Sequence, residues 1–231
     1  LVNLDKFNNL SGVADLIYNP KRTQIILDAE KRKINNISGL YMLAAQAKKA
    51  AEYFFRKEYD EGIIDFITEK LSFELSNIVL VGMPGCGKTT IGILLAEKYG
   101  RKLVDTDALI VEKAGMTIPE IFSEQGETGF RKIEAEVAKE AGKEKGLIIA
   151  TGGGVIVTPE NHDALRQNAT VVFINRDIEV LPTDGRPLSQ KNNLHDMYKK
   201  RLPLYRSICH HEVDGNGTVE EVAERIEALF R

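Results

Sequence analysis

One short motif constrains the fold of this chain more than any other feature. Residues 82–89 read Gly-Met-Pro-Gly-Cys-Gly-Lys-Thr and match the pattern G-x-x-x-x-G-K-[ST] at every defined position. An apolar run, residues 78–81, comes directly before the motif, and an amphipathic segment that ends at Gly100 comes after it. This order of strand, loop and helix predicts a phosphate-binding P-loop.

The chemistry expected of the motif follows from its backbone. Glycine adopts backbone angles closed to other residues, so successive N–H groups can point at phosphate oxygens, and the following helix adds its positive N-terminal dipole. Lys88 is expected to balance β- and γ-phosphate charge, and the Thr89 hydroxyl to bind magnesium. Cys86 is interpreted as a small filler residue in preference to a redox-sensitive thiol. The predicted nucleotide-binding residues are Gly85, Cys86, Gly87, Lys88, Thr89 and Thr90.

From residue 76 onward, short apolar runs alternate with amphipathic segments, which is typical of β–α units around a parallel sheet. Continuous apolar strands also imply helices on both faces of the sheet. The pattern predicts an α/β fold of the P-loop NTPase class, similar to the nucleoside-monophosphate kinases, with a parallel five-stranded sheet and a mostly helical N-terminal extension. The expected strands are residues 78–81, 102–104, 147–150, 171–174 and a weak one around Val213.

The first 72 residues follow a different pattern. One strand is expected at residues 13–18, and helices at residues 23–33, 39–57 and 61–71. Asn35, Asn36 and Ser38 are expected to supply turn and cap chemistry before the helix at 39–57. So little sheet argues against an independent α/β domain. The chain is therefore divided into an extension, residues 1–72, and a P-loop domain, residues 73–231.

Composition narrows the partners and the compartment. A net charge of −3 over 231 residues gives no general attraction to nucleic acid or acidic membranes. The two cysteines, Cys86 and Cys209, make no disulfide framework and suit a reducing cytosol. No stretch approaches the roughly 18 apolar residues that a membrane span needs, and no signal-peptide pattern opens the sequence. We therefore expect a cytoplasmic protein that binds small molecules.

A P-loop alone does not separate kinases from GTPases and motor ATPases. The sequence contains no Asn-Lys-x-Asp guanine signature, which argues against a GTPase. Motor ATPases usually end a strand with an acidic metal ligand, whereas here the third expected strand runs into Thr151-Gly152-Gly153-Gly154. These two observations favour a small-metabolite kinase.

Two carboxylates follow the second of the expected strands. Asp105 and Asp107 are predicted to lie at the carboxyl edge of the sheet, where open α/β folds bind their ligands. On an extended segment, residues two apart face the same side, so both carboxylates can face one crevice. One would serve the water shell of a metal, and the other would accept a hydrogen bond from an attacking hydroxyl. A solvated loop, or a cap for a helix that starts at Ala108, explains the pair equally well.

Four further motifs have ordinary explanations when each is taken singly. In G-E-x-x-F-R-x-x-E, residues 126–134, the arginine and the second glutamate share a helix face and could form a surface ion pair. The three glycines at 152–154 could be a plain loop, although they also let the backbone approach a ligand closely. R-P-L at 186–188 lies in a polar loop, residues 182–193, that is expected to be mobile. R-x-P-x-Y at 201–205 could be a solvated basic helix face.

The joint order of these motifs resembles that of the shikimate kinases, from about residue 77 to the C-terminus. P-loop, D-x-D, F-R-x-x-E, G-G-G, R-P-L and R-x-P-x-Y follow one another as they do in that family. Each motif is short, but their conjunction is specific. The resemblance implies phosphorylation of the 3-hydroxyl of shikimate by ATP with Mg²⁺ as cofactor, in the pathway to chorismate and the aromatic amino acids.

The resemblance also implies which residues hold the acceptor. Asp107 would hold the acceptor hydroxyl as its base or orienting group. Arg131 and Arg201 would clamp the shikimate carboxylate, for which guanidinium geometry suits bidentate contact. The backbone N–H groups of Gly153 and Gly154 would complete that pocket.

On the nucleotide side, Asp105 and Thr89 would hold magnesium, directly or through water. Lys88 and Arg186 would stabilise charge on the transferring phosphoryl group, and Arg186 would also contact the nucleotide. The family usually has another lid arginine, shortly before R-P-L, that stacks on adenine. Here that stretch reads Leu-Pro-Thr-Asp-Gly, residues 181–185. We therefore expect a raised Michaelis constant for ATP or looser base selectivity.

The N-terminal residues, about 1–68, resemble the closing segment of shikimate dehydrogenase. The matching motifs are D-L-I-Y-N-P-x-x-T at 15–23 and S-G-L-x-M-L-x-x-Q-A at 38–47. In that family the tyrosine and the glutamine touch substrate, but residues 1–71 contain no dinucleotide-binding glycine loop and no lysine–aspartate pair. The hypothesis is that the chain is the carboxyl part of a dehydrogenase–kinase fusion. The alternative is a helical prefix that packs locally, on the kinase or on a second copy.

Two other functions remain open at this point. Another P-loop metabolite kinase, acting on gluconate or a nucleoside monophosphate, would use the same phosphate loop. A weakly active binding module, in which the extension mediates assembly, would bind nucleotide with little turnover. The paired acidic residues, the triple glycine and the two arginines favour shikimate over another metabolite, and turnover would discriminate the binding module.

Overall fold

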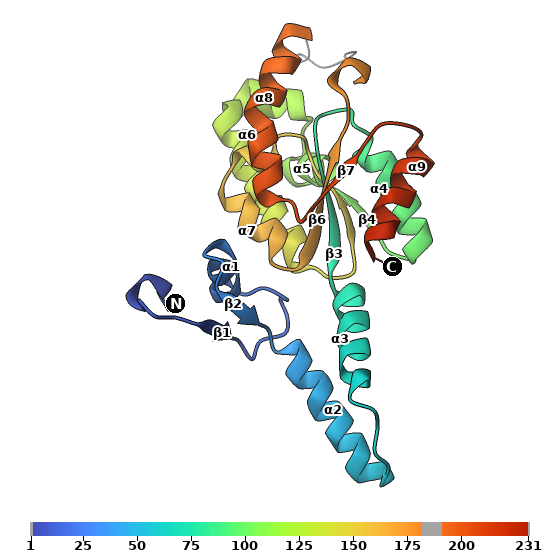
Figure 1. Cartoon of the computed structure of the whole chain (residues 1–231). Coiled ribbons are helices and arrows are strands. Elements are labelled where there is room, and N and C mark those ends of the chain that lie inside the picture. The colour runs from blue at the N-terminus through green and yellow to red at the C-terminus, as the bar shows by residue number, and fades with distance from the viewer. Residues whose placement is uncertain (1, 182–190, 231) are drawn as a thin grey trace. The chain divides into compact units, whose positions relative to one another are not determined.

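The computed structural model describes residues 2–181 and 191–230 and divides the chain into two compact units, shown in Figure 1. The N-terminal unit is Leu1–Ser76 and the C-terminal unit is Asn77–Arg231. The division falls four residues after the boundary expected from the sequence. The identification of residues 1–72 as a dehydrogenase-like extension stays a prediction.

A parallel five-stranded sheet forms the centre of the C-terminal unit, in the order β4-β5-β3-β6-β7. Its central strand, β3, pairs with β5 on one side and with β6 on the other. The predicted α/β fold with a parallel five-stranded sheet is confirmed. The strands are β3 (Asn77–Val81), β4 (Leu103–Asp105), β5 (Ile148–Ala150), β6 (Ala169–Asn175) and β7 (His211–Asp214).

Helices cover both faces of this sheet, as Figure 1 shows, and the central strands are therefore mainly apolar. Every residue of β3 and β5 is buried. In the figure α4 and α9 cover one face, and α6, α7 and α8 the other. The helices are α4 (Lys88–Tyr99), α5 (Thr106–Ala114), α6 (Ile118–Lys143), α7 (Glu160–Arg166), α8 (Lys191–Ile208) and α9 (Val219–Glu227), with 3₁₀ turns at Val155–Val157, Ile178–Val180 and Ala228–Phe230.

The ends of these helices follow local sequence signals. Gly100 adopts the left-handed conformation that ends α4, with φ of 62°. A capping box made by Thr218 and Glu221 opens α9. A second capping box, made by Thr117 and Glu120, opens α6. These caps satisfy helix N–H groups that would otherwise lack partners, so both helices begin where the sequence indicates.

Two expectations about the loops need correction. Asp105 is the last residue of β4, and Asp107 lies in the first turn of α5, so the Asp-Thr-Asp segment is not extended throughout. The expected loop at 182–193 is shorter at its end, because α8 already begins at Lys191. Residues 182–190, with Arg186 and the R-P-L motif, lie outside the described residues.

The N-terminal unit contains a small parallel sheet of its own. Strand β1 (Gly12–Ala14) pairs in parallel with β2 (Asn35–Ile37), and α1 (Gln24–Lys31) connects them. Helices α2 (Leu40–Phe55) and α3 (Gly62–Leu75) follow, and a 3₁₀ turn at Leu4–Lys6 comes first. The prediction of turn chemistry at 35–38 was therefore wrong in part, and the strand expected at 13–18 is shorter. A three-residue strand with two asparagines carries too little apolar alternation to be read from sequence.

The two dehydrogenase-like motifs of this unit lie against each other. The Gly39 N–H donates to the Ile17 carbonyl at 3.1 Å. A Cβ atom at position 39 would lie 1.9 Å from the Leu16 carbonyl oxygen, so only glycine permits this approach. Tyr18 and Gln46 are both exposed.

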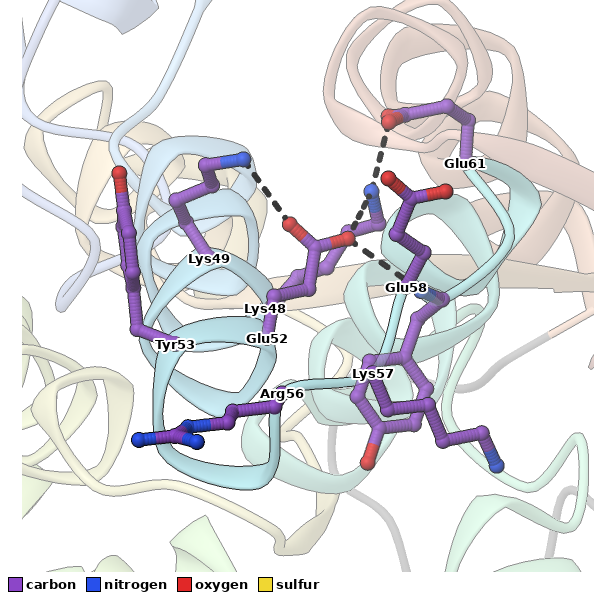
Figure 2. A pocket seen from close by; sticks show the side chains of 9 residues that line it. Lys48, Lys49, Glu52, Tyr53, Arg56, Lys57, Glu58 and Glu61 are labelled. Carbon is purple, nitrogen blue, oxygen red and sulfur yellow. Dashed lines mark hydrogen bonds and ion pairs between the residues drawn. The ribbon is translucent and has the colours of Figure 1, made fainter.

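Where α2 turns into α3, charged side chains surround a surface hollow of about 540 Å³, drawn in Figure 2. Glu52 lies at its centre and pairs with Lys48 at 3.0 Å and with Lys49 at 3.1 Å. Lys48 also reaches Glu61 at 2.6 Å, and the Tyr59 N–H donates to Glu52. Hydrogen bonds from Lys48 and Lys49 lower the pKa of Glu52 to about 2. The charges around the hollow thus pair with one another, and the pair of Lys48 with Glu61 connects α2 to the start of α3.

None of the described helices combines the length and the apolar character that crossing a bilayer requires.

The pKa of Glu52 predicts how the α2–α3 turn responds to acid. Because the folded pKa of about 2 lies below the ordinary 4.5, the stability that Glu52 contributes is complete above about pH 4.5 and is lost as the pH falls through 2. Hydrogen exchange of residues 40–61 at pH 6 should be faster in Glu52→Gln than in the parent, and this difference should disappear towards pH 2.

Glu58→Gln is the matched control, since Glu58 lines the same hollow but makes no ion pair among the described residues. It should exchange like the parent at every pH. A difference for Glu52→Gln that did not change with pH would contradict the account.

Candidate active site

Three of the predicted site segments lie at the carboxyl ends of three neighbouring strands. The P-loop follows β3, Asp105 ends β4, and Thr151–Gly154 follow β5. Because β5 pairs with both β3 and β4, these three strand ends are adjacent. Ligands of open α/β sheets bind at this edge.

The P-loop has the backbone that its sequence predicts. Gly82, Gly85 and Gly87 have φ of 155°, 84° and 97°, values that side-chain-bearing residues rarely adopt. The Lys88 ammonium is buried and donates to the Gly82 and Met83 carbonyls at 3.0 and 2.9 Å. The loop therefore wraps around a positive charge at the N-terminus of α4, which suits an anion.

Thr89 and Asp105 lie together beside the loop. The Thr89 hydroxyl donates to one oxygen of Asp105 at 2.7 Å, and the other oxygen accepts from the N–H groups of Asp107 and Ala108. Asp105 thus caps helix α5, which was one of the alternatives in the sequence analysis, and it also contacts the P-loop threonine. Hydroxyl and carboxylate oxygens fit a hard cation such as Mg²⁺. No cluster of three or more metal-binding side chains occurs among the described residues, and a metal shared with substrate phosphates needs none.

Asp107 is brought into the same crevice by helix α5 and not by an extended strand end. Its carboxylate lies against the glycine loop, where a Cβ atom on Gly152 would be 2.4 Å from Oδ1. The Gly152 N–H donates to the buried Thr106 hydroxyl at 3.0 Å, which holds the loop beside α5. Asp107 is therefore half-buried, next to Gly152 and one turn into its helix.

Arg131 reaches the crevice from α6 through a partly buried ion-pair network. Its Nη1 lies 2.8 Å from Glu134 and 3.1 Å from the Gly154 carbonyl, and its other side contacts Glu127 at 3.1 Å. Burial raises the pKa of Glu134, and the Arg131 charge opposes that shift. Burial favours a lower pKa for Arg131, but Glu134 and Glu127 outweigh it, so the pKa is raised. The arginine stays charged and its orientation is fixed.

Arg201 and Tyr205, on α8, both bind the glycine loop. Arg201 Nη1 and the Tyr205 hydroxyl donate to the Gly153 carbonyl at 3.1 and 2.6 Å. On its other side Gly153 faces the P-loop, where an added Cβ would lie 2.6 Å from Pro84 Cδ. The loop at 152–154 is therefore held between the P-loop and α8.

Three residues near the site had no assigned role in the sequence interpretation. Tyr205 stood in the R-x-P-x-Y motif but was read as part of a helix face, and Glu134 as part of a surface pair. Arg176 directly follows β6, and its Nη1 lies 3.9 Å from a Cβ position built on Gly87. A charged residue at the carboxyl end of a buried strand was the signal that could have identified Arg176.

Arg186, the predicted lid residue, lies outside the described residues.

Comparisons with known proteins agree on one family. The family model for shikimate kinase matches residues 84–230. A shikimate kinase from Clostridium botulinum (strain Alaska E43 / Type E3) is 42% identical over 161 residues, covering 67% of this chain and 97% of the relative.

Solved structures give the same result. The structure of shikimate kinase from Acinetobacter baumannii in complex with shikimate is 40% identical, with a TM-score of 0.64, and the match covers 70% of this chain and 96% of that one. Shikimate kinase from Aquifex aeolicus is 30% identical, with a TM-score of 0.60, and the match covers 66% and 94% of the two chains.

The two glutamates that flank Arg131 should differ in their effect on stability. Glu134 is almost fully buried and Glu127 is exposed. Glu134→Gln leaves the half-buried Arg131 without its buried counter-charge and should lower the free energy of unfolding by about 1 to 3 kcal/mol. Glu127→Gln should cost less than about 1 kcal/mol. Urea denaturation followed by circular dichroism measures both, and equal losses would contradict the assigned network.

Proposed function

Because the chain belongs to the shikimate kinase family, we propose that it transfers the γ-phosphoryl group of ATP to the 3-hydroxyl of shikimate and releases ADP and 3-phosphoshikimate. The chain is thus a phosphotransferase with an alcohol acceptor. The observation that carries the proposal is the contact of two loops. The phosphate loop, through Pro84, lies directly against the glycine loop, through Gly153, and guanidinium groups flank that glycine loop.

The P-loop would hold the phosphates of ATP. N–H groups of Gly85, Cys86 and Gly87 and of the first turn of α4 would donate to phosphate oxygens. Lys88 now donates to two carbonyls of its own loop, and charged phosphate oxygens are stronger acceptors for the same ammonium. The lysine would therefore turn from the loop to the β- and γ-phosphates. Thr90, exposed one position further along α4, would contact the nucleotide next to Thr89.

We propose Mg²⁺ as the metal of this site, held by Thr89 and Asp105 directly or through water. A bound divalent ion would neutralise charge on the phosphates. The 2.7 Å hydrogen bond between the two side chains supports this assignment, since it places the two oxygens next to each other beside the P-loop.

The acceptor would lie between the glycine loop and the two arginines. Arg131 and Arg201 both reach carbonyls of the glycine loop, at Gly154 and Gly153, so their guanidinium groups flank it. A carboxylate there would receive charge-assisted hydrogen bonds from both, with N–H groups of Gly153 and Gly154 as further donors.

Asp107 would orient the acceptor hydroxyl and take its proton. The hydroxyl oxygen forms a bond to the γ-phosphorus while the bond from that phosphorus to the β,γ-bridging oxygen breaks, and ADP leaves with the electron pair. Lys88 and Arg186 would stabilise the charge that develops on the phosphoryl group. The role of Arg186 and the raised Michaelis constant for ATP stay predictions from the sequence.

Substrate choice tests the function directly. With ATP and Mg²⁺, ADP release should appear on adding shikimate and be absent with gluconate or AMP. Turnover of either of those, or none with shikimate, would overturn the proposal.

Asp107→Asn should lower kcat by about two to four orders of magnitude, because the amide keeps the shape of the side chain but cannot take a proton. Binding of ADP, measured by calorimetry, should stay within a factor of about two of the parent, since Asp107 lies on the acceptor side. A variant that kept most of its turnover would show that this carboxylate is not the base.

For the N-terminal unit we propose that it is the closing part of a dehydrogenase in a dehydrogenase–kinase fusion, which would place two consecutive reactions in one polypeptide. Its surface supports an origin in a larger fold. Of the sixteen large apolar side chains exposed among the described residues, thirteen lie before residue 77. A two-stranded parallel sheet is also unusual alone, because parallel sheets are normally covered on both faces. A cytoplasmic location stays a prediction from composition.

The gene upstream of the codon for Leu1 tests the fusion. An open reading frame that continues into a dinucleotide-binding domain is the expected result. A stop codon directly upstream in the same frame would contradict it.

A further inference from the structure

Tyr205 is a fully buried aromatic residue in the wall of the active site. Its ring stacks on Phe173 of β6, with centroids 4.8 Å apart and an interplanar angle of 12°. Its hydroxyl lies 3.9 Å from the sulfur of Met83 in the P-loop. Phe173 pairs in register with Val81, the last residue of β3. The ring, which α8 carries, is therefore held in place by contacts with the sheet and with the P-loop.

The hydroxyl of this fixed ring holds one carbonyl of the glycine loop. It donates to the Gly153 oxygen at 2.6 Å, and Arg201, one turn earlier on the same face of α8, donates to the same oxygen at 3.1 Å. Burial raises the pKa of Tyr205, so the hydroxyl keeps its proton and remains a donor throughout the physiological pH range.

A carbonyl held in this way also fixes the N–H of the next residue. In a trans peptide the C=O of one residue and the N–H of the next point in opposite directions. With the Gly153 carbonyl directed at α8, the Gly154 N–H is directed away from α8. Among the described residues this N–H has no acceptor, and the Arg131 guanidinium lies beside Gly154.

We infer that Tyr205 is a positioning residue for the acceptor pocket: its hydroxyl anchors the 153–154 peptide so that the Gly154 N–H, beside the Arg131 guanidinium, is directed at the substrate carboxylate. The inference rests on the proposed function, because it assigns a substrate carboxylate to this pocket. Tyr205 does not touch the substrate. The phosphates of ATP would be held by N–H groups of the P-loop and not by the 153–154 peptide, so loss of the hydroxyl should act on the acceptor and not on the nucleotide.

Tyr205→Phe tests this, because it removes the hydroxyl and keeps the ring that stacks on Phe173. We expect the KM for shikimate to rise about three- to ten-fold, the equivalent of one hydrogen bond. The kcat and the KM for ATP should each stay within about a factor of two. If the hydroxyl has a purely structural role, its removal would lower the melting temperature without raising the KM for shikimate selectively.

Tyr198→Phe is the matched control, since Tyr198 lies two turns earlier on α8 and its hydroxyl donates to Asn175 at 2.9 Å, away from the glycine loop. It should leave the KM for shikimate unchanged. If Tyr205→Phe does not fold, Phe173→Leu, which loosens the ring but keeps the hydroxyl, should raise the same KM by a smaller factor.

The outcomes separate the two proposals. A parent protein without shikimate turnover would overturn the proposed function and this inference together. Turnover in the parent with an unchanged KM in Tyr205→Phe, or an equal rise of both Michaelis constants, would overturn the inference alone.

Discussion

The close contact between Pro84 and Gly153 is the constraint on which the rest of the site depends. It joins the loop after β3 to the loop after β5, two strands paired in register, and leaves no room for a side chain at position 153. The neighbouring glycines are restricted by other partners, since a Cβ on Gly152 would meet Asp107 and one on Gly154 would meet Arg131. Three consecutive glycines therefore bring three functional elements to one point: a side chain at 153 would collide with Pro84, and one at 152 or 154 would displace the functional end of Asp107 or Arg131.

Charge in this crevice is stabilised by pairing more than by solvent. Arg131 keeps its charge although it is half-buried, because Glu134 is buried beside it and Glu127 contacts it from outside. A buried pair of this kind contributes little net stability, since desolvation offsets most of the attraction. What it does fix is the direction in which the guanidinium points. The arrangement is thus better suited to orienting a ligand than to holding the fold together.

Local patterns were readable from the sequence and tertiary contacts were not. The P-loop, the strands around it and the Arg131–Glu134 pair each depend on residues within a few positions of one another. Asp107 was placed on an extended segment because the local sequence fitted an extended loop and a helix cap equally well, and only the structure shows that Asp105 caps α5. The role of Tyr205 depends on Gly153, 52 residues away, and no spacing rule connects them. Strand β2 was missed because its sequence, Asn-Asn-Ile, carries no strand periodicity.

The two units differ in how far they bury their own apolar side chains. The C-terminal unit covers its sheet with helices on both faces, so its apolar strands are buried within the unit itself. The N-terminal unit keeps large side chains such as Phe54 and Phe55 exposed, and ion pairs from Lys48 to Glu52 and Glu61 connect α2 to the start of α3. Ion pairs at a surface stabilise weakly and respond to salt and acid. The C-terminal unit therefore carries its own buried core, whereas the N-terminal unit leaves a large apolar surface of the kind that marks interaction sites.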